Sequence, residues 1–133
     1  MEIVKVTIDW CNKNYSAFIG EKIGGVVIVT DKSLEGLKKK LQEAVEFHFE
    51  GLGSEATDWM KHKDYQFAYT YTISATLQNA LNYTTLAAIS RITGIRHAQL
   101  SHYANAVSRP KQQQSDKIIS GLHTIGNACL AAY

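Results

Sequence analysis

Five polar side chains of types that hydrogen-bond nucleic acid lie close together in the segment TLAAISRITGIRHAQLSHYANA, residues 85–106. An arginine guanidinium suits guanine or a phosphate, and a glutamine amide can make two hydrogen bonds to adenine. Imidazole and hydroxyl groups also reach base edges and phosphates. We predict that these five side chains contact DNA bases. They are Arg96, His97, Gln99, Ser101 and His102.

Two short helices joined by a tight turn would present this surface. Glycine ends a helix well because its left-handed conformation carries no Cβ penalty, so Gly94 is the predicted stop, and Ile95 follows where a residue packs back onto the last turn. This is the spacing of a helix-turn-helix, whose second helix enters the DNA major groove. The same periodicity fits a purely structural helical hairpin, and the polar surface favours DNA. The predicted inward residues are Leu86, Ile89 and either Ile92 or Thr93 before the turn, and Leu100 and Tyr103 after it.

The charge of the chain is unevenly distributed. Residues 66–133 hold five basic side chains and one acidic one, a net charge of +4, whereas residues 1–65 hold nine basic and eleven acidic ones, a net charge of −2. The basic residues of the second half lie in or after the predicted helix-turn-helix, where a phosphate backbone would pass. A basic solvated face is the alternative. The predicted phosphate contacts are Thr85, through its backbone amide at a helix start, and Arg91, Arg109 and Lys111.

A further helix is predicted on either side of this pair. Residues 74–81 should carry Ala75, Leu77 and Leu81 inward. The terminal helix, about residues 111–131, has more apolar surface than one small bundle needs, and Gly121 and Gly126 would allow close backbone approach. Because repressors with this motif read paired half-sites, we predict a homodimer or a higher even oligomer; packing on its own domain is the alternative. The predicted interface is Ile118, Ile119, Leu122, Ile125 and Leu130, with Cys129 and Tyr133 also on the apolar stripes.

The first half has a β-rich pattern around one helix. Apolar and polar residues alternate over residues 3–9 and 15–19, with a turn at residues 12–14, and residues 26–30 are an apolar run suited to a buried strand. Asp31 or Ser33 can cap the helix that follows. Residues 65–72, in which aromatic residues alternate with small or polar ones, are the clearest strand. The predicted helical stripe is Leu34, Leu37, Leu41, Val45, His48 and Leu52.

The order of these elements predicts the fold class. A β-β-β-α-β domain at residues 1–73 is followed by an all-α domain at residues 74–133, which makes an α+β protein.

Carboxylates of the first half are the side chains that could bind a catalytic metal ion. Asp31 is better explained as a helix cap and Glu43 as a solvent-facing neighbour of Lys39, so we predict no active site and no enzyme. The residues in question are Asp9, Asp31, Glu43 and Glu46.

Three other residues invite a chemical interpretation. His48 on an apolar stripe is typical of a core histidine with one hydrogen-bond partner. Cys11 and Cys129 are isolated in the sequence and are interpreted as buried thiols.

No segment approaches the ~20 apolar residues of a membrane span, and MEIVKVTIDW lacks a signal-peptide core. We expect a cytoplasmic chain without a membrane partner, metal or cofactor.

Two parts of the sequence together resemble a known family. IVKVTIDW, NYSAFI and VVIVTDKSLEGLKKKLQEAVEFHFEGL are similar to a HicB antitoxin domain, and ISRITGIRHAQLSHYANAVSRP with KIISGLHTIGNACL is similar to a helix-turn-helix of the phage-repressor (XRE/Cro) type. The resemblance implies that residues 1–73 form a partially degraded RNase H-like fold that blocks a small, basic, RNA-cleaving HicA-like toxin. It also implies that residues 74–133 bind operator DNA and repress the toxin–antitoxin operon. The acidic first half suits a basic partner.

The chain departs from the family pattern at both ends of the recognition helix. Arg96 stands where Ser or Asn caps that helix. Ala106 replaces the glycine that ends it, so Asn105 is predicted to take the left-handed conformation.

Two other function classes fit the sequence. One is an RNase H-like nucleic-acid-processing enzyme, and the other is a transcriptional regulator whose first domain senses a small ligand. Metal-dependent RNA cleavage that is lost on mutating Asp9 or Glu43 would identify the enzyme.

Overall fold

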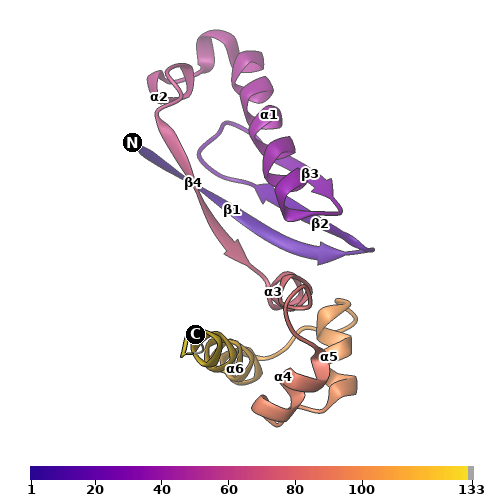
Figure 1. The fold of residues 1–133 in the computed structure, drawn as a ribbon. Helices are drawn as coiled ribbons and strands as arrows, with labels where there is room; N and C mark the ends of the chain where they lie inside the picture. The colour runs from indigo at the N-terminus through magenta and orange to yellow at the C-terminus, as the bar shows by residue number, and fades with distance from the viewer. Residues whose placement is uncertain (132–133) are drawn as a thin grey trace. The chain divides into compact units, whose positions relative to one another are not determined.

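The computed structural model describes residues 1–131, and the chain divides into two compact units between Thr72 and Ile73. Among the described residues are four β-strands, six α-helices and one short 3-10 helix, which make an α+β fold (Figure 1). The strands all belong to the first unit, and the second unit is helical.

The first unit is built on a mixed four-stranded sheet. Its strands are β1 (Glu2–Cys11), β2 (Asn14–Ile19), β3 (Val27–Asp31) and β4 (Tyr65–Tyr71), in the order β3-β2-β1-β4. The first three form the predicted antiparallel meander, and β4 pairs in parallel with β1. The predicted turn between β1 and β2 is confirmed, because Asn12 and Lys13 both have positive φ, 52° and 66°. Two such residues match the twist of a tight hairpin.

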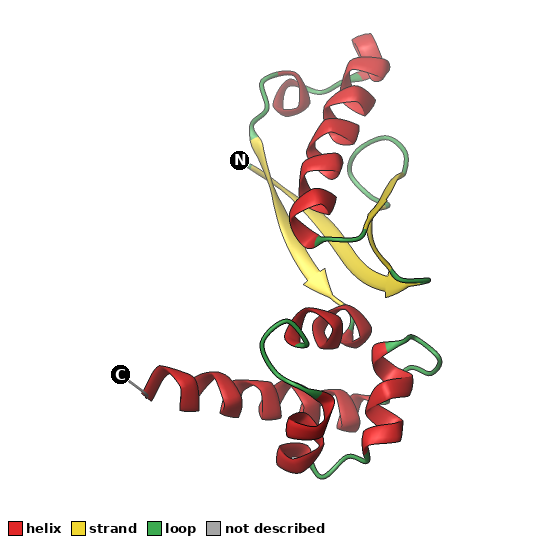
Figure 2. Ribbon diagram, turned by 45° about the vertical axis from the view of Figure 1, so that its right-hand side comes forward, coloured by secondary structure: helices red, strands yellow, loops and turns green. Residues whose placement is uncertain are grey.

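One long helix, α1 (Leu34–Leu52), packs on one face of this sheet (Figures 1 and 2). Alternate residues of the strands point toward it, and the helix repeats its buried positions every four residues. Of the predicted stripe, Leu37, Leu41 and Val45 are buried. Leu34, His48 and Leu52 are half-buried, and the buried position after Val45 is Phe49. The core includes Val4, Val6, Ile8, Tyr15, Ala17, Ile19 and Val27 of the sheet, Leu37, Leu41, Val45 and Phe49 of the helix, and Ile23, Ala56 and Met60 of the connecting segments.

The apolar run before α1 is an edge strand, and the prediction of a buried strand is wrong. β3 pairs with β2 on one side only. Val27 is buried against α1, but Val26 and Ile28 are 57% and 63% exposed. An unbroken apolar run is typical of a strand covered on both faces, and here one face of the sheet is left open beside Ile28.

The start of α1 is fixed by Ser33, which settles the choice between the two predicted caps. Its Oγ accepts a hydrogen bond from the backbone N–H of Gly36 at 3.0 Å. The carboxylate of Asp31 accepts from the Ser33 backbone and from its hydroxyl, and pairs with Lys40 at 2.9 Å. The hydrogen bond from Lys40 and that from the Ser33 backbone together lower the pKa of Asp31 from 3.8 to about 2.

Replacing Asp31 with asparagine should flatten the response of this unit to acid. Since the pKa of Asp31 is lower in the folded chain, its ionised form stabilises the fold at pH above about 4, and this stabilisation is lost as the pH falls toward 2. Denaturant unfolding of the native chain and of Asp31→Asn between pH 5 and pH 2 would measure this. Equal losses of unfolding free energy in both proteins would contradict the expectation.

The segment between α1 and β4 closes the end of the sheet. It contains a 3-10 turn (Gly53–Glu55) and the short helix α2 (Asp58–Lys61), where the sequence indicated a loop or loose helical turn. Edge-to-face contacts join Phe49 to Trp59 and to Tyr65, with ring centroids 5.7 and 5.5 Å apart. Aromatic packing of this kind gives the segment its own small cluster.

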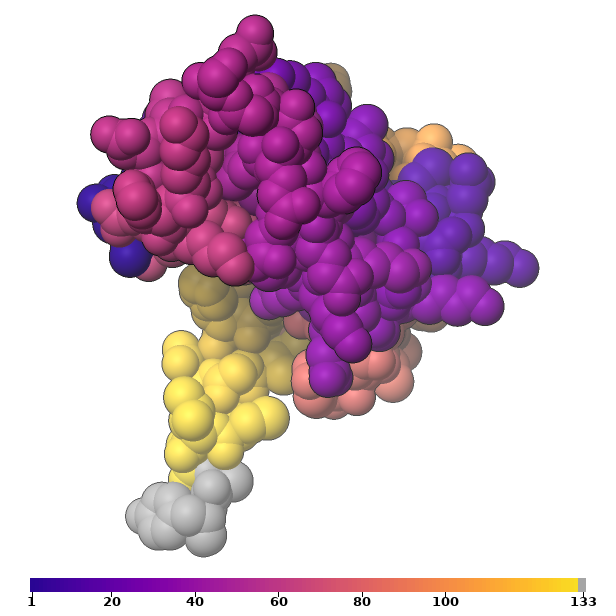
Figure 3. All heavy atoms as spheres, turned by 90° about the horizontal axis from the view of Figure 1, so that it is seen from above, coloured from indigo at the N-terminus to yellow at the C-terminus, as the bar shows by residue number. Residues whose placement is uncertain are grey.

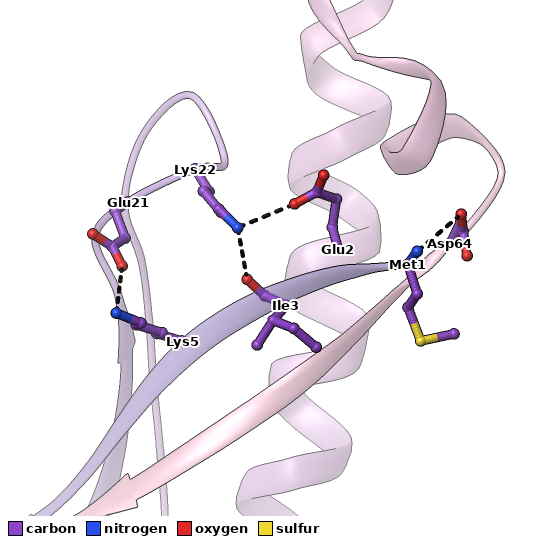
Figure 4. Close-up of polar contacts among 7 residues, drawn as sticks. All are labelled: Met1, Glu2, Ile3, Lys5, Glu21, Lys22 and Asp64. Carbon is purple, nitrogen blue, oxygen red and sulfur yellow. Dashed lines mark hydrogen bonds and ion pairs between the residues drawn. The ribbon is translucent and has the colours of Figure 1, made fainter.

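Exposed ion pairs join β1 and the N-terminus to the loop before β3 and to the residue before β4 (Figure 4). The ammonium group of Lys22 lies 3.1 Å from Glu2 and donates to the backbone carbonyl of Ile3 at 3.2 Å. The N-terminal amine lies 3.9 Å from Asp64. Each exposed pair is worth little on its own. The Lys22 contacts join the loop before β3 to β1, and the Asp64 pair joins the start of the chain to the residue before β4.

The described part of the second unit, residues 73–131, contains four helices, α3 (Ile73–Ala80), α4 (Leu86–Thr93), α5 (His97–Ala104) and α6 (Gln112–Ala131). Of the inward residues predicted on α3, Ala75 and Leu77 are buried and Leu81 is half-buried. The last turns of α6 extend beyond the rest of the unit (Figures 2 and 3). The core cluster is Leu77, Ile89, Ile95, Leu100, Tyr103, Ala104 and Ile118.

Candidate nucleic-acid interface

Local hydrogen bonds fix the turn between α4 and α5. Thr85 caps α4 by accepting from the Ala88 backbone at 3.1 Å, and Gly94 ends that helix in the left-handed conformation, at φ 76° and ψ 4°. The next residue, Ile95, is buried, as predicted. Thr93 is half-buried and its hydroxyl donates to the Ile89 carbonyl at 2.7 Å, so the inward position is taken by Thr93 and not by Ile92, which is exposed.

The faces of α5 separate apolar from polar residues. Leu100, Tyr103 and Ala104 point into the core. At about 100° per residue, the positions opposite this face are Ala98 and His102, and both are exposed. Of the five predicted base contacts, Arg96, His97 and His102 are exposed, while Gln99 and Ser101 are half-buried on the two flanks. Sequence reasoning missed Ala98, which has no polar group but lies at the centre of the outer face.

The two ends of α5 have different capping. Arg96 occupies the N-cap position and makes no side-chain cap hydrogen bond, as the sequence indicated. At the other end, the prediction for Asn105 is wrong: its φ is −96°, and Ala106 takes the positive φ of 58°. The reason is that the Asn105 amide donates back to the Ser101 carbonyl at 2.9 Å, which keeps this residue near helical geometry.

A hollow at the start of α5 is lined by a further cation, from α6. Lys117 of α6 lines it together with Arg96 and Gln99, and the hollow has a volume of about 360 Å³. Sequence reasoning counted Lys117 only in the total charge. Its proximity follows from the packing of Ile118, the next residue, into the core. These two cations and the Gln99 amide can together hydrogen-bond a phosphate or a base edge.

The predicted phosphate contacts differ in their contacts within the unit. Arg109 donates from Nη1 to the hydroxyl of Ser74 at 3.1 Å, and that buried hydroxyl donates to the Tyr103 carbonyl at 2.7 Å. Arg109 therefore helps to join α3 to the end of α5. Thr85, Arg91 and Lys111 are exposed, and Lys111 immediately precedes α6.

The predicted interface residues of α6 are divided between core and surface. Ile118 is fully buried in its own unit, so it is not a surface residue, and Leu122 and Ile125 pack partly against the same core. Ile119 is exposed and Leu130 is 82% exposed. Tyr133 lies outside the described residues. The surface available to a second copy is thus the outer side and the last turns of the helix.

Other candidate groups lie apart from one another. Asp9 accepts from Thr72 at 2.7 Å, Glu46 pairs with Lys63 at 3.5 Å, and Glu43 is exposed. No group of three or more His, Cys, Asp or Glu side chains in residues 1–131 could hold a metal ion.

The cysteine prediction is wrong. Cys11 and Cys129 are free and both are exposed: Cys11 is the last residue of β1, at the turn before β2, and Cys129 lies near the end of α6.

Comparison with protein-family models, curated proteins and solved structures found no match for this chain. Within the part of the chain that the structure describes, no helix combines the length and apolar character that crossing a membrane requires.

Proposed function

We propose that the chain is the antitoxin of a type II toxin–antitoxin pair, which represses its own operon through α4 and α5 and has no catalytic activity. The observation that carries the DNA-binding part is the tight turn at Gly94, after which α5 exposes Arg96, His97 and His102, with Arg96 and Lys117 lining one hollow at its start. A helix with an exposed polar surface, held against the preceding helix by a tight turn, is the arrangement that a helix-turn-helix places in the major groove. The XRE/Cro-like sequence supports the same assignment.

The antitoxin part of the proposal rests on the first unit. Its sheet and single long helix, in the order β-β-β-α-β, agree with the resemblance to a HicB domain with an RNase H-like topology. The net negative charge of residues 1–65 suits a small basic RNA-cleaving toxin. The exposed part of α6 would join two copies, so that each reads one operator half-site.

The proposal predicts that the two activities separate by unit. Lys111→Ala should weaken binding to operator and unrelated DNA alike and reduce the slope of the salt dependence by about one, because a phosphate contact carries no sequence information. Arg96→Ala should weaken operator binding by about 1–3 kcal/mol. Neither change should alter neutralisation of the toxin, taken as the small basic protein encoded beside this chain. Titrating the same variants with operator DNA and with toxin tests this.

Two results would contradict this division. Normal operator binding by Arg96→Ala would mean that the recognition helix is misplaced, and loss of toxin binding by either variant would reverse the roles of the units. Lys111 is the better phosphate probe than Arg109, because removing the Arg109 guanidinium also removes the hydrogen bond to Ser74.

A further inference from the structure

The free edge of β3 presents backbone groups that can pair with another strand. The carbonyl of Thr30 points away from β2, since it accepts a hydrogen bond from Lys40 at 3.1 Å. Because backbone groups alternate in direction along an antiparallel strand, the N–H and C=O of Ile28 point to the same outer side. An edge strand with such groups is a template for a strand of another chain.

An apolar groove runs between this edge and α1. It is a hollow of about 450 Å³, here called the edge groove, and Phe47 on its helical wall is 78% exposed. Natural edge strands usually carry charges or are covered, whereas Val26 and Ile28 leave this edge apolar. Its lining residues are Val26, Val27, Ile28, Ala44, Phe47, His48, Gly51 and Leu52.

The groove is held open by contacts within the unit. His48 Nε2 lies 2.7 Å from the carbonyl oxygen of Ile23, which is fully buried just before β3. Gly25 approaches the same ring so closely that an added Cβ would lie 2.9 Å from His48 Cε1. The loop and α1 are therefore fixed against each other, and a partner would meet a formed groove rather than create one.

The charges around Phe47 determine which partner fits. Glu43 and Glu50 are exposed and stand four residues before and three residues after it, so they lie on the same side of α1. Lys40, at the opposite end of β3, is engaged by Asp31 and by the Thr30 carbonyl. Carboxylates beside Phe47 and the net charge of −2 over residues 1–65 favour a basic partner.

We propose that a strand of the basic toxin adds to the β3 edge and places an apolar side chain in the edge groove against Phe47; this rests on the proposed antitoxin function. A second copy of this chain fits the edge less well. A symmetric β3–β3 pairing would bring together two units of the same net negative charge, and like charges across an interface are unfavourable.

Two variants of the full chain test the proposal, with the small basic protein encoded beside it as the probe. Ile28→Lys places a charge at the edge and Phe47→Ala removes the anchor, and we expect each to weaken binding by about tenfold or more. Both side chains are exposed, so folding should be unaffected. Tyr83→Ala is the matched control, because Tyr83 is an exposed aromatic residue of the second unit and not of the sheet. It should change the affinity less than about twofold.

Hydrogen exchange supplies an independent readout. The amide of Ile28 should become protected from exchange when the toxin is added. If other amides became protected instead, and both variants bound the toxin with normal affinity, the inference would be overturned and the proposed function would stand. Protection that grows with the concentration of the chain alone would assign the edge to a second copy and would also overturn it. Absence of toxin binding by the unaltered chain would overturn the proposed function, and this inference with it.

Discussion

Replacing Ala98 with glutamate is expected to abolish specific DNA binding while leaving the second unit folded. Ala98 is exposed at the centre of the outer face of α5, and glutamate is a good helix former. In a complex, the new carboxylate would face base edges and phosphates, and opposed like charges cost several kcal/mol. We expect an affinity at least about 100-fold lower, measured by titration of a labelled operator duplex.

The chemically identical change Ala68→Glu controls for net charge. Ala68 is exposed on β4, in the other unit, so the same carboxylate is added outside the helix-turn-helix. If Ala98→Glu and Ala68→Glu weakened binding equally, the effect would be one of total charge, and the outer face of α5 would not be the recognition surface.

Gly121→Ala is expected to destabilise the second unit by about 1–3 kcal/mol, in spite of the better helix propensity of alanine. A Cβ at this position would lie 2.5 Å from Thr93 Cγ2. That methyl group cannot rotate away freely, since the Thr93 hydroxyl donates to the Ile89 carbonyl and accepts from the Ile95 amide at 3.2 Å. The substitution should therefore push α6 away from α4.

Gly126→Ala is the matched control within the same helix. No atom lies within 4 Å of an added Cβ there, so the change should stabilise the helix by up to about 1 kcal/mol. Thermal or denaturant unfolding of both variants measures the contrast. A stabilised Gly121→Ala variant would contradict the close packing of α4 on α6.

The sequence predicted those elements that depend on local rules. The Asn12-Lys13 turn, the cap at Thr85 and the stop at Gly94 follow from side chains that hydrogen-bond their own backbone or from a required backbone conformation. The alternation in β1 and β2 follows from one face being buried.

Which apolar residues are buried, and which side chains from different helices meet, depends on tertiary contacts that the sequence pattern does not reveal. The exposure of Ile28 depends on which face of the sheet α1 covers and on which strand lies at the edge, and an apolar run contains neither piece of information. Likewise, Ile118 and Leu130 belong to similar apolar stripes, but only the packing of α4 on α6 buries the first and leaves the second exposed. Lys117 joined Arg96 for the same reason, since the approach of α6 to α5 cannot be derived from spacing along either helix.

The most direct test of the central claim, that α5 reads DNA, is a competition titration of the full chain. A labelled duplex from the region upstream of its own gene would be displaced either by the same unlabelled duplex or by an unrelated one of equal length. At physiological salt, we predict a preference of at least about 1,000-fold for the upstream duplex. Equal displacement by both duplexes, or no binding to either, would contradict the account.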